Sequence, residues 1–347
     1  MSPSDTPQTG TRRAWYLKPL RWLVVALLWF CRFLLLAWAA LALYYSKLPW
    51  PAARMALAVA FLVFGIWALW FARGKRSFLV FTLVYLGIVG WWATIHASHD
   101  RPWRAEVAVM PRVTIDGDRV HISGFRNFKY RSRDDFDRVY EERDFLLSHL
   151  TSVDLYVSYW AVGPVGHTFV SFNFDNAEPL CISIETRPEV GEGFDPLASL
   201  FKEFELIYVV GDERDLVGLR AVHRNEDVFL YRVRATPEAA RRLLLVYLER
   251  INQLADTPEW YHLLSNSCTI NIIRYARQAG RTTQFDIRHL LNGFIDQYLY
   301  ASGKLDGDSL PFDDLRKQSH INDAVKAADG AGDFPQRIRA GLPKPGA

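Results

Sequence analysis

Three long apolar stretches at the start of the chain limit its possible folds more than any other feature of the sequence. They cover residues 22–45, 55–72 and 78–95. A helix that crosses a membrane needs about 20 mostly apolar residues, within a range of about 17–25. The first stretch is too long for the apolar core of a cleaved signal peptide, and two more follow it. The sequence therefore predicts three membrane-spanning helices within a membrane domain of residues 1–97.

Positively charged residues in the short flanking segments predict how these helices are oriented. The N-terminal flank carries Arg12, Arg13, Lys18 and Arg21, the loop between the second and third stretches carries Arg73, Lys75 and Arg76, and the loop between the first and second carries only Lys47 and Arg54. Because Lys and Arg accumulate on the cytoplasmic side, we expect the N-terminus and the second loop to be cytoplasmic. In a Gram-negative cell the protein is then a multi-pass protein of the inner membrane, with its C-terminal domain in the periplasm.

Arg32 lies near the middle of the first apolar stretch. A charge at that depth is costly, so such residues usually face protein or extend toward the interface. We expect one of these two arrangements for Arg32, and binding of a lipid headgroup is the alternative.

The charge and the cysteine pattern exclude several kinds of protein. The net charge is only +3 and no block of like charge is present, so we expect no nucleic-acid partner. The three cysteines, Cys31, Cys181 and Cys268, are too few for a disulfide framework and lack zinc-site spacing. None of the nine histidines lies in a metal-ligand motif. We predict no metal and no cofactor, and a disulfide between Cys181 and Cys268 is an alternative in an oxidising compartment.

The chain after residue 97 alternates between strand and helix patterns. We place the exported domain at residues 98–324 and expect residues 325–347, rich in Ala, Gly, Pro and charge, to be disordered. Runs of β-branched and aromatic residues predict strands of one antiparallel sheet at residues 153–160, 167–174, 180–186, 204–210 and 228–234. The patterns also predict a hairpin at residues 111–123, a surface helix at 134–150, and helices at 237–254 and 268–279. The fold class is therefore α+β.

Cys268 is a candidate nucleophile because of its place at the start of a predicted helix. Polar residues 265–267 precede it, and an apolar helical stripe follows. The first turn of a helix has unpaired N–H groups and a positive dipole end. Both favour the thiolate, which is the reactive form of cysteine, and the free N–H groups could also hold an oxyanion. The structural alternative is a buried and inert cysteine.

His167 is the candidate base for this nucleophile. It follows a glycine-flanked turn and begins the predicted strand at residues 167–174. Side chains alternate along a strand, so a hairpin loop at residues 175–179 would place Cys181, Ser183, Glu185 and Arg187 of the next strand on the same face as His167. Glu185 is then diagonal to His167 and is our candidate for the third polar residue. It could instead pair with a surface charge, and His149, His223 and His262 are lower-ranked alternatives to His167.

Several segments of the exported domain resemble a known family. They are VDL and SYW in residues 153–160, GHTFVSF at 166–172, ISIETR at 182–187 and SNSCT at 265–269. These motifs resemble the Lnb-type periplasmic domain, which is related to bacterial lipoprotein N-acyltransferases, over roughly residues 125–280. That domain is similar to permuted papain-like, NlpC-type folds, in which the histidine precedes the cysteine, as His167 precedes Cys268. The resemblance implies a permuted papain-like domain with an antiparallel sheet and packed helices.

The resemblance implies that Cys268 accepts an acyl group and that His167 is the general base, with Glu185 as a less firm transfer. We assign Tyr156, Ser158 and Asn266, which lie in the same segments, to substrate binding. The expected reaction moves an acyl chain from a phospholipid to an amine such as a lipoprotein N-terminus, through a thioester. A cysteine peptidase or amidase acting on cell-wall peptide, and a non-enzymatic membrane-anchored binding module, are the alternatives. The sequence does not indicate an oligomeric state.

Overall fold

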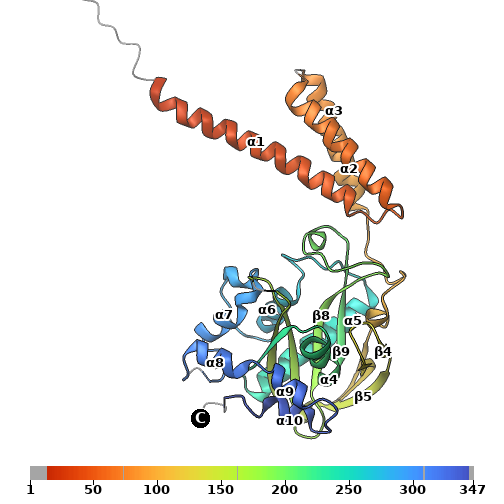
Figure 1. The fold of residues 1–347 in the computed structure, drawn as a ribbon, viewed down its shortest axis with the longest axis vertical. Helices are drawn as coiled ribbons and strands as arrows, with labels where there is room; N and C mark the ends of the chain where they lie inside the picture. Colours follow the sequence, from red (N-terminus) through yellow and green to blue (C-terminus); the bar gives the residue numbers. More distant parts are fainter. Residues whose placement is uncertain (1–13, 73, 162, 308, 344–347) are drawn as a thin grey trace, which may run out of the picture. The chain divides into compact units, whose positions relative to one another are not determined.

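The computed structural model describes residues 14–72, 74–161, 163–307 and 309–343. The chain divides into two compact units, Met1–His96 and Ala97–Ala347 (Figure 1). This division lies next to the boundary predicted between residues 97 and 98. Each unit is described by itself below.

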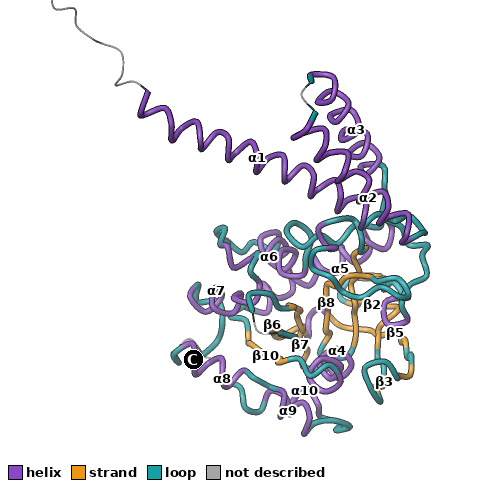
Figure 2. The backbone as a smooth tube through the Cα atoms, turned by 45° about the horizontal axis from the view of Figure 1, so that its top comes forward, coloured by secondary structure: helices purple, strands orange, loops and turns teal. Residues whose placement is uncertain are grey.

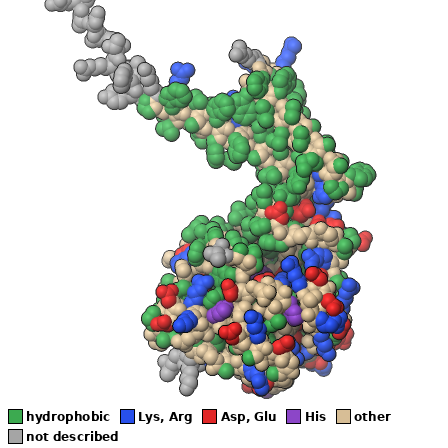
Figure 3. All heavy atoms as spheres, in the orientation of Figure 1, with side chains coloured by type: hydrophobic (Ala, Val, Ile, Leu, Met, Phe, Trp, Pro, Cys, Tyr) green, Lys and Arg blue, Asp and Glu red, His purple; other side chains and the backbone are tan. Residues whose placement is uncertain are grey.

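The first unit consists of three apolar helices, α1 (Ala14–Tyr44), α2 (Pro51–Ile66) and α3 (Lys75–Ala93). A π-helical segment, Trp67–Phe71, continues α2. The parts long and apolar enough to cross a membrane are Pro19–Tyr44, Pro51–Phe71 and Lys75–Ala93. Hydrophobic side chains cover the surface of these helices (Figure 3). The three predicted spans are therefore present as helices.

The contacts within this unit show how its helices pack. A Cβ atom added at Gly65 would lie only 2.2 Å from a side-chain carbon of Leu36, so α1 and α2 approach closely at this glycine. The ring of Phe61 stacks on that of Phe81 and joins α2 to α3. The guanidinium of Arg32 lies 5.7 Å from the ring centroid of Trp70. Arg32 thus packs against protein, as expected for a charge at this position.

The second unit is built on an eight-stranded, mostly antiparallel sheet in the order β1-β2-β9-β8-β7-β6-β10, with β5 paired to β2 outside this path. Its strands are β1 (Arg112–Asp116), β2 (Arg119–Arg126), β5 (Tyr140–Leu146), β6 (Leu150–Tyr159), β7 (His167–Phe174), β8 (Leu180–Arg187), β9 (Glu205–Gly211) and β10 (Asp227–Arg232). Two short strands, β3 (Lys129–Tyr130) and β4 (Phe136–Asp137), form a separate pair. The α+β class and the antiparallel sheet are thereby confirmed.

Helices cover both faces of the sheet, as Figure 1 shows. They are α4 (Glu213–Gly218), α5 (Pro237–Asp256), α6 (Cys268–Gln278), α7 (Ile295–Ala301), α8 (Phe312–Ser319), α9 (Asn322–Ala327) and α10 (Phe334–Arg339). On one face, Phe172 of β7 contacts Tyr247 of α5. On the other, Phe169 of β7 belongs to a buried cluster with residues of α4, α9 and α10. Neighbouring residues of β7 therefore lie in different layers, as alternation along a strand requires.

Local signals identified several of these elements correctly. Gly117 has a φ of +58° in the turn between β1 and β2, which confirms the predicted hairpin. The Thr236 side chain accepts a hydrogen bond from the backbone of Ala239 and caps α5, with Pro237 as its first residue. Gly280 follows α6 with a φ of +90°, a conformation that favours glycine at the end of a helix.

The helix predicted at residues 134–150 is wrong. The structure has β4 and β5 in this segment, and β5 pairs with β2. Phe145 lies opposite Val120 and is buried, whereas Asp144 bonds to Arg119 at the surface. Pairing with an available strand and burial of alternate side chains therefore prevailed over the spacing of apolar residues that indicated a helix.

The expectation of a disordered segment after residue 325 is also wrong for residues 325–343. Phe334, Ile338 and Leu342 are buried in the cluster that covers one face of the sheet. Arg339 donates hydrogen bonds to Asp154 at 2.9 Å and to Glu213 at 2.8 Å. A few apolar side chains and one arginine are enough to order this segment, although its overall composition is typical of disorder. Residues 344–347 of the prediction lie outside the described residues.

Candidate active site

Cys268 is the first residue of α6, as predicted, and only 1% of it is exposed. Ser267 precedes the helix in an extended conformation and makes no side-chain cap. The N–H groups of the first turn are therefore not occupied by the usual capping oxygen. Helix α6 packs against β7, the strand that begins with His167.

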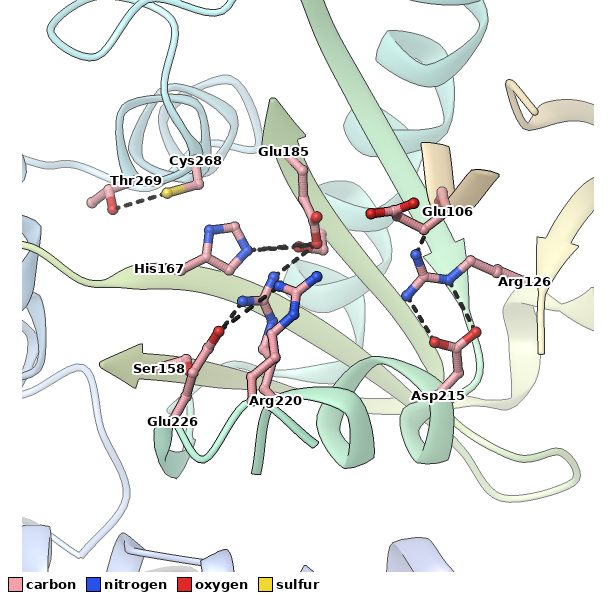
Figure 4. A network of polar contacts seen from close by, with 12 residues as sticks. Glu106, Arg126, Ser158, His167, Glu185, Asp215, Arg220, Glu226, Cys268 and Thr269 are labelled. Atoms are coloured by element: carbon pink, nitrogen blue, oxygen red, sulfur yellow. Dashed lines mark hydrogen bonds and ion pairs between the residues drawn. The ribbon is translucent and has the colours of Figure 1, made fainter. Parts of the chain in front are cut away.

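The imidazole of His167 lies between Cys268 and the side chains of β8 (Figure 4). Its Nε2 atom is 2.7 Å from Ser183 Oγ, and that hydroxyl donates to Glu185 Oε1 at 2.7 Å. The direct distance from His167 Nε2 to Glu185 Oε1 is 3.9 Å. Glu185 thus holds the imidazole mainly through Ser183, and Ser183 is a site residue that we did not assign from the sequence.

The surroundings of Cys268 favour its ionised form. Burial raises the pKa of the thiol, but the charge and hydrogen bond of His167 and hydrogen bonds from the backbone and side chain of Thr168 act in the opposite direction. The net effect lowers the pKa of Cys268 from 9.0 to about 6. A thiol with this pKa is largely a thiolate at neutral pH, which is the form that attacks carbonyl groups.

Glu185 is charged because of a neighbouring arginine. Burial alone raises the pKa of the Glu185 carboxyl, but Arg220 and His167 lower it well below its usual range. Arg220 donates to Glu185 Oε1 at 2.9 Å and to Glu226 Oε2 at 3.1 Å (Figure 4). Arg220 is itself buried, so this network fixes the position of Glu185 beside the imidazole.

Two further residues at Cys268 come from distant parts of the chain. Asn292 Nδ2 lies 3.8 Å from the Cys268 sulfur and donates to the Gly166 carbonyl at 2.7 Å. The buried Tyr261 hydroxyl hydrogen-bonds to both the backbone and the side chain of Cys268. Tyr261 lies in the loop before α6, and Asn292 begins a 3-10 helix of only three residues, Asn292–Phe294, that has no apolar stripe. Local patterns therefore carried no signal for them.

The residues predicted to bind substrate lie in the interior or in structural contacts. Tyr156 and Ser158 are fully buried; the Tyr156 hydroxyl donates to Glu213 at 2.8 Å, and the Ser158 hydroxyl donates to Glu226. Asn266 Nδ2 donates to the Trp260 carbonyl at 2.9 Å. We therefore withdraw Tyr156 and Ser158 as substrate contacts, because carboxylates already occupy their hydroxyl groups within the core. Asn266 positions the loop before Cys268.

The alternative bases make their contacts elsewhere. His149 Nδ1 is 2.6 Å from Asp175, and His262 Nδ1 is 3.0 Å from Ser265 Oγ. The His223 ring lies against Tyr130, with the ring centroids 5.6 Å apart. His167 is the histidine that interacts with Cys268.

The cysteines form no disulfide with one another. Cys31, Cys181 and Cys268 are all free, so the alternative of a disulfide between Cys181 and Cys268 is wrong. Cys181 is buried beside Tyr156 and Phe169 in the core instead. Within the described residues, no group of three or more His, Cys, Asp or Glu side chains is arranged to hold a metal ion.

Comparisons with known proteins agree with the motifs that carried the resemblance. A family model described as the Lnb N-terminal periplasmic domain matches residues 136–316, which is more than half of the chain. The matched region contains His167, Ser183, Glu185 and Cys268. No curated protein and no solved structure matches the chain. With its three apolar helices, the chain is an Lnb-type membrane protein, and it belongs to the family defined by the Lnb N-terminal periplasmic domain.

Proposed function

We propose that this protein is a membrane-anchored periplasmic acyltransferase that uses Cys268 as its nucleophile and His167 as its base. It moves an acyl chain from a phospholipid to an amine such as a lipoprotein N-terminus. The observation that supports this proposal most directly is the position of Cys268 at the start of α6 beside His167, whose ring is held by Ser183 and Glu185. These surroundings lower the pKa of the buried thiol to about 6. A thiol that ionises below neutral pH is typical of a catalytic cysteine, whereas an inert buried thiol has a raised pKa.

The first half of the proposed reaction forms a thioester. His167 takes the thiol proton, and the sulfur of Cys268 attacks the ester carbonyl of the phospholipid. The Tyr261 hydroxyl holds the oxyanion, because it lies beside the sulfur. The ester C–O bond then breaks, and His167 returns its proton to the departing alcohol of the lysophospholipid.

The second half transfers the acyl group. The amine nitrogen attacks the thioester carbonyl, the C–S bond breaks, and the sulfur leaves as a thiolate. His167 takes the proton that the amine loses when the amide forms. Ser183 and Glu185 keep the imidazole in one orientation through both halves, since Nε2 is bonded to Ser183 and the other ring nitrogen is left for the sulfur.

The three apolar helices support a substrate that resides in the membrane. By the distribution of Lys and Arg, they cross the inner membrane with the second unit in the periplasm. Anchoring of an enzyme to the surface that contains its substrate raises the effective concentration of that substrate. A phospholipid acyl donor therefore suits this chain better than a soluble peptide.

The test compares strains that carry the wild-type protein, the Cys268→Ala variant and the Cys31→Ser variant as a matched cysteine control. Mass spectrometry of lipoprotein N-termini should show the N-acyl chain with wild type and Cys31→Ser but not with Cys268→Ala. The purified full chain, mixed with phospholipid, should gain the mass of one acyl group at Cys268. Unchanged N-terminal acylation in the Cys268→Ala strain would end the proposal, and release of peptides from peptidoglycan would replace it with the amidase alternative.

A further inference from the structure

An apolar cavity lies beside α6, between this helix, α5, α7 and the strands β6 and β7. Fourteen of its nineteen lining residues are aliphatic, among them Leu155, Val170, Ile272 and Leu299. Figure 2 shows α6 and α7 beside the strands at this end of the sheet. A site with this lining favours hydrocarbon over a polar ligand.

The cavity reaches the candidate nucleophile at one end. Its lining includes Thr168 and Thr269, the residues that directly follow His167 and Cys268. The two threonine hydroxyls are 2.9 Å apart, and Thr269 Oγ1 is 3.8 Å from the Cys268 sulfur. This hydrogen-bonded pair is therefore the boundary between the sulfur and the cavity.

The lining then follows α6 away from Cys268. It continues from Thr269 to Ala276, which is about 10 Å along a helix with a rise of about 1.5 Å per residue. Beyond the helix it includes Arg281 and Lys304, which are only partly buried. Lys304 Nζ donates to the Thr282 carbonyl at 3.1 Å, so its ammonium group is held outside the apolar part while its stem lines it.

We propose that this cavity holds the acyl chain while its carbonyl is bound to Cys268, with the Thr168 and Thr269 hydroxyl pair as the gate between them. This inference rests on the proposed function and adds the binding site for the hydrocarbon. The cavity volume is about 70 Å³. At about 10–15 Å³ per water-sized group, it has room for roughly five to seven methylene groups. A longer chain leaves the cavity between Arg281 and Lys304.

The test uses thiol reagents of increasing length, so that it does not depend on turnover. The full chain with Cys31→Ser reacts with methyl to octyl methanethiosulfonates, and mass spectrometry follows Cys268. The thiolate forms a disulfide with the alkylthio sulfur, the S–S bond of the reagent breaks, and methanesulfinate leaves with the bonding electrons. With the cavity unaltered, the rate at which Cys268 reacts should rise by up to roughly fourfold for each methylene group that is buried. The rate should then level off beyond about five to seven methylene groups.

Two variants on α6 separate the cavity from its surroundings. Ala276→Phe fills the cavity, whereas Gln278→Phe places the same ring on the exposed side of the helix. Ala276→Phe should react with the methyl reagent as the wild type does but lose the gain with length, and Gln278→Phe should keep it. If Ala276→Phe does not fold, Leu299→Trp fills the same cavity from α7.

The results distinguish this inference from the proposed function. An equal gain with length in the filled variants and in Gln278→Phe would overturn the cavity as the chain site. A gain that only the filled variants lose would support it, even if lipoprotein acylation proved independent of Cys268. In that case the cavity is supported as the binding site for the chain, and the lipoprotein N-terminus is rejected as the acceptor.

Discussion

Replacing His167 with alanine should raise the pKa of the Cys268 thiol from about 6 to about its ordinary value of 9.0. Burial raises this pKa, and the charge and hydrogen bond of His167 have the largest opposing effects, so without His167 only the hydrogen bonds from Thr168 act against burial. A thiol is ionised above its pKa. At pH 7 the wild-type thiolate is then about 90% of the total, whereas the variant has about 1% or less.

The rate of alkylation changes less than the thiolate population does. A thiolate of higher pKa is a better nucleophile, with a Brønsted coefficient of about 0.4–0.5. When the pKa rises by about three units, the thiolate population at pH 7 falls roughly 90-fold, but each thiolate reacts about 16 to 32 times faster. The alkylation rate at pH 7 therefore falls by only about 3- to 6-fold. The midpoint of the pH profile is thus the decisive quantity.

The assay follows alkylation of the full chain by iodoacetamide across the pH range, with mass spectrometry at Cys268. His149→Ala is the matched control, because His149 is exposed and bonds to Asp175. Its profile should keep the wild-type midpoint near 6. A midpoint near 6 in His167→Ala, or one near 9 in the wild type, would refute the reasoning.

Three further predictions concern the oxyanion donor and two buried ion pairs. Tyr261→Phe should lower kcat for acyl transfer from labelled phospholipid by about 10²–10³ while the alkylation midpoint of the nucleophile stays low; an unchanged kcat would place the donor elsewhere. Asp215→Ala leaves Arg126 buried without its carboxylate partner and should lower the free energy of unfolding by about 3–5 kcal/mol in a denaturant titration, and a negligible loss would contradict the pairing. Burial raises the pKa of the Glu213 carboxyl, but Arg339 lowers it, and in the folded protein the pKa is below its ordinary value of 4.5. The ionised pair of Glu213 and Arg339 therefore stabilises the folded state fully above pH 4.5, and this contribution is lost as the pH falls through the pKa that Glu213 has in the folded protein. The gap in Tm between wild type and Arg339→Ala should accordingly narrow in acid, and a constant gap would show that Arg339 acts by packing.

The positions of Cys268 and His167 could be predicted because their signals are local. A run of capping residues before an apolar stripe marks the start of a helix, and a glycine turn before a β-branched run marks the start of a strand. The structure brings the two residues together across a distance of about 100 residues in the chain. Their catalytic roles, and the papain-like character of the fold, remain predictions.

The third member of the site shows where alternation stops being informative. It places Ser183 and Glu185 on the face of His167, and the register of β7 and β8 agrees, with Phe169 opposite Ser183. Alternation of side chains does not indicate whether Ser183 or Glu185 contacts the imidazole of His167. The shorter side chain does so, because Arg220 holds the carboxylate of Glu185 on its other side.

The structure departs from these expectations at contacts that no local pattern contains. Tyr156 and Ser158 lie on a predicted strand, but the carboxylates that accept their hydroxyls belong to α4 and to the segment before β10. The segment at residues 134–150 has apolar residues at helical spacing, but it forms a strand because β5 pairs with β2. Three-dimensional neighbours, rather than propensity, settle such positions.

The ion pair between Asp154 and Arg339 has a consequence for how the domain is made. The two residues are 185 positions apart. A chain synthesised from its N-terminus presents Asp154 long before its counter-ion, and burying that carboxylate alone is costly. Contacts over such separations also slow folding, because the loop must close before the contact can form. Burial of the Asp154 carboxylate on β6 is therefore expected to follow the docking of α10, the helix that carries Arg339.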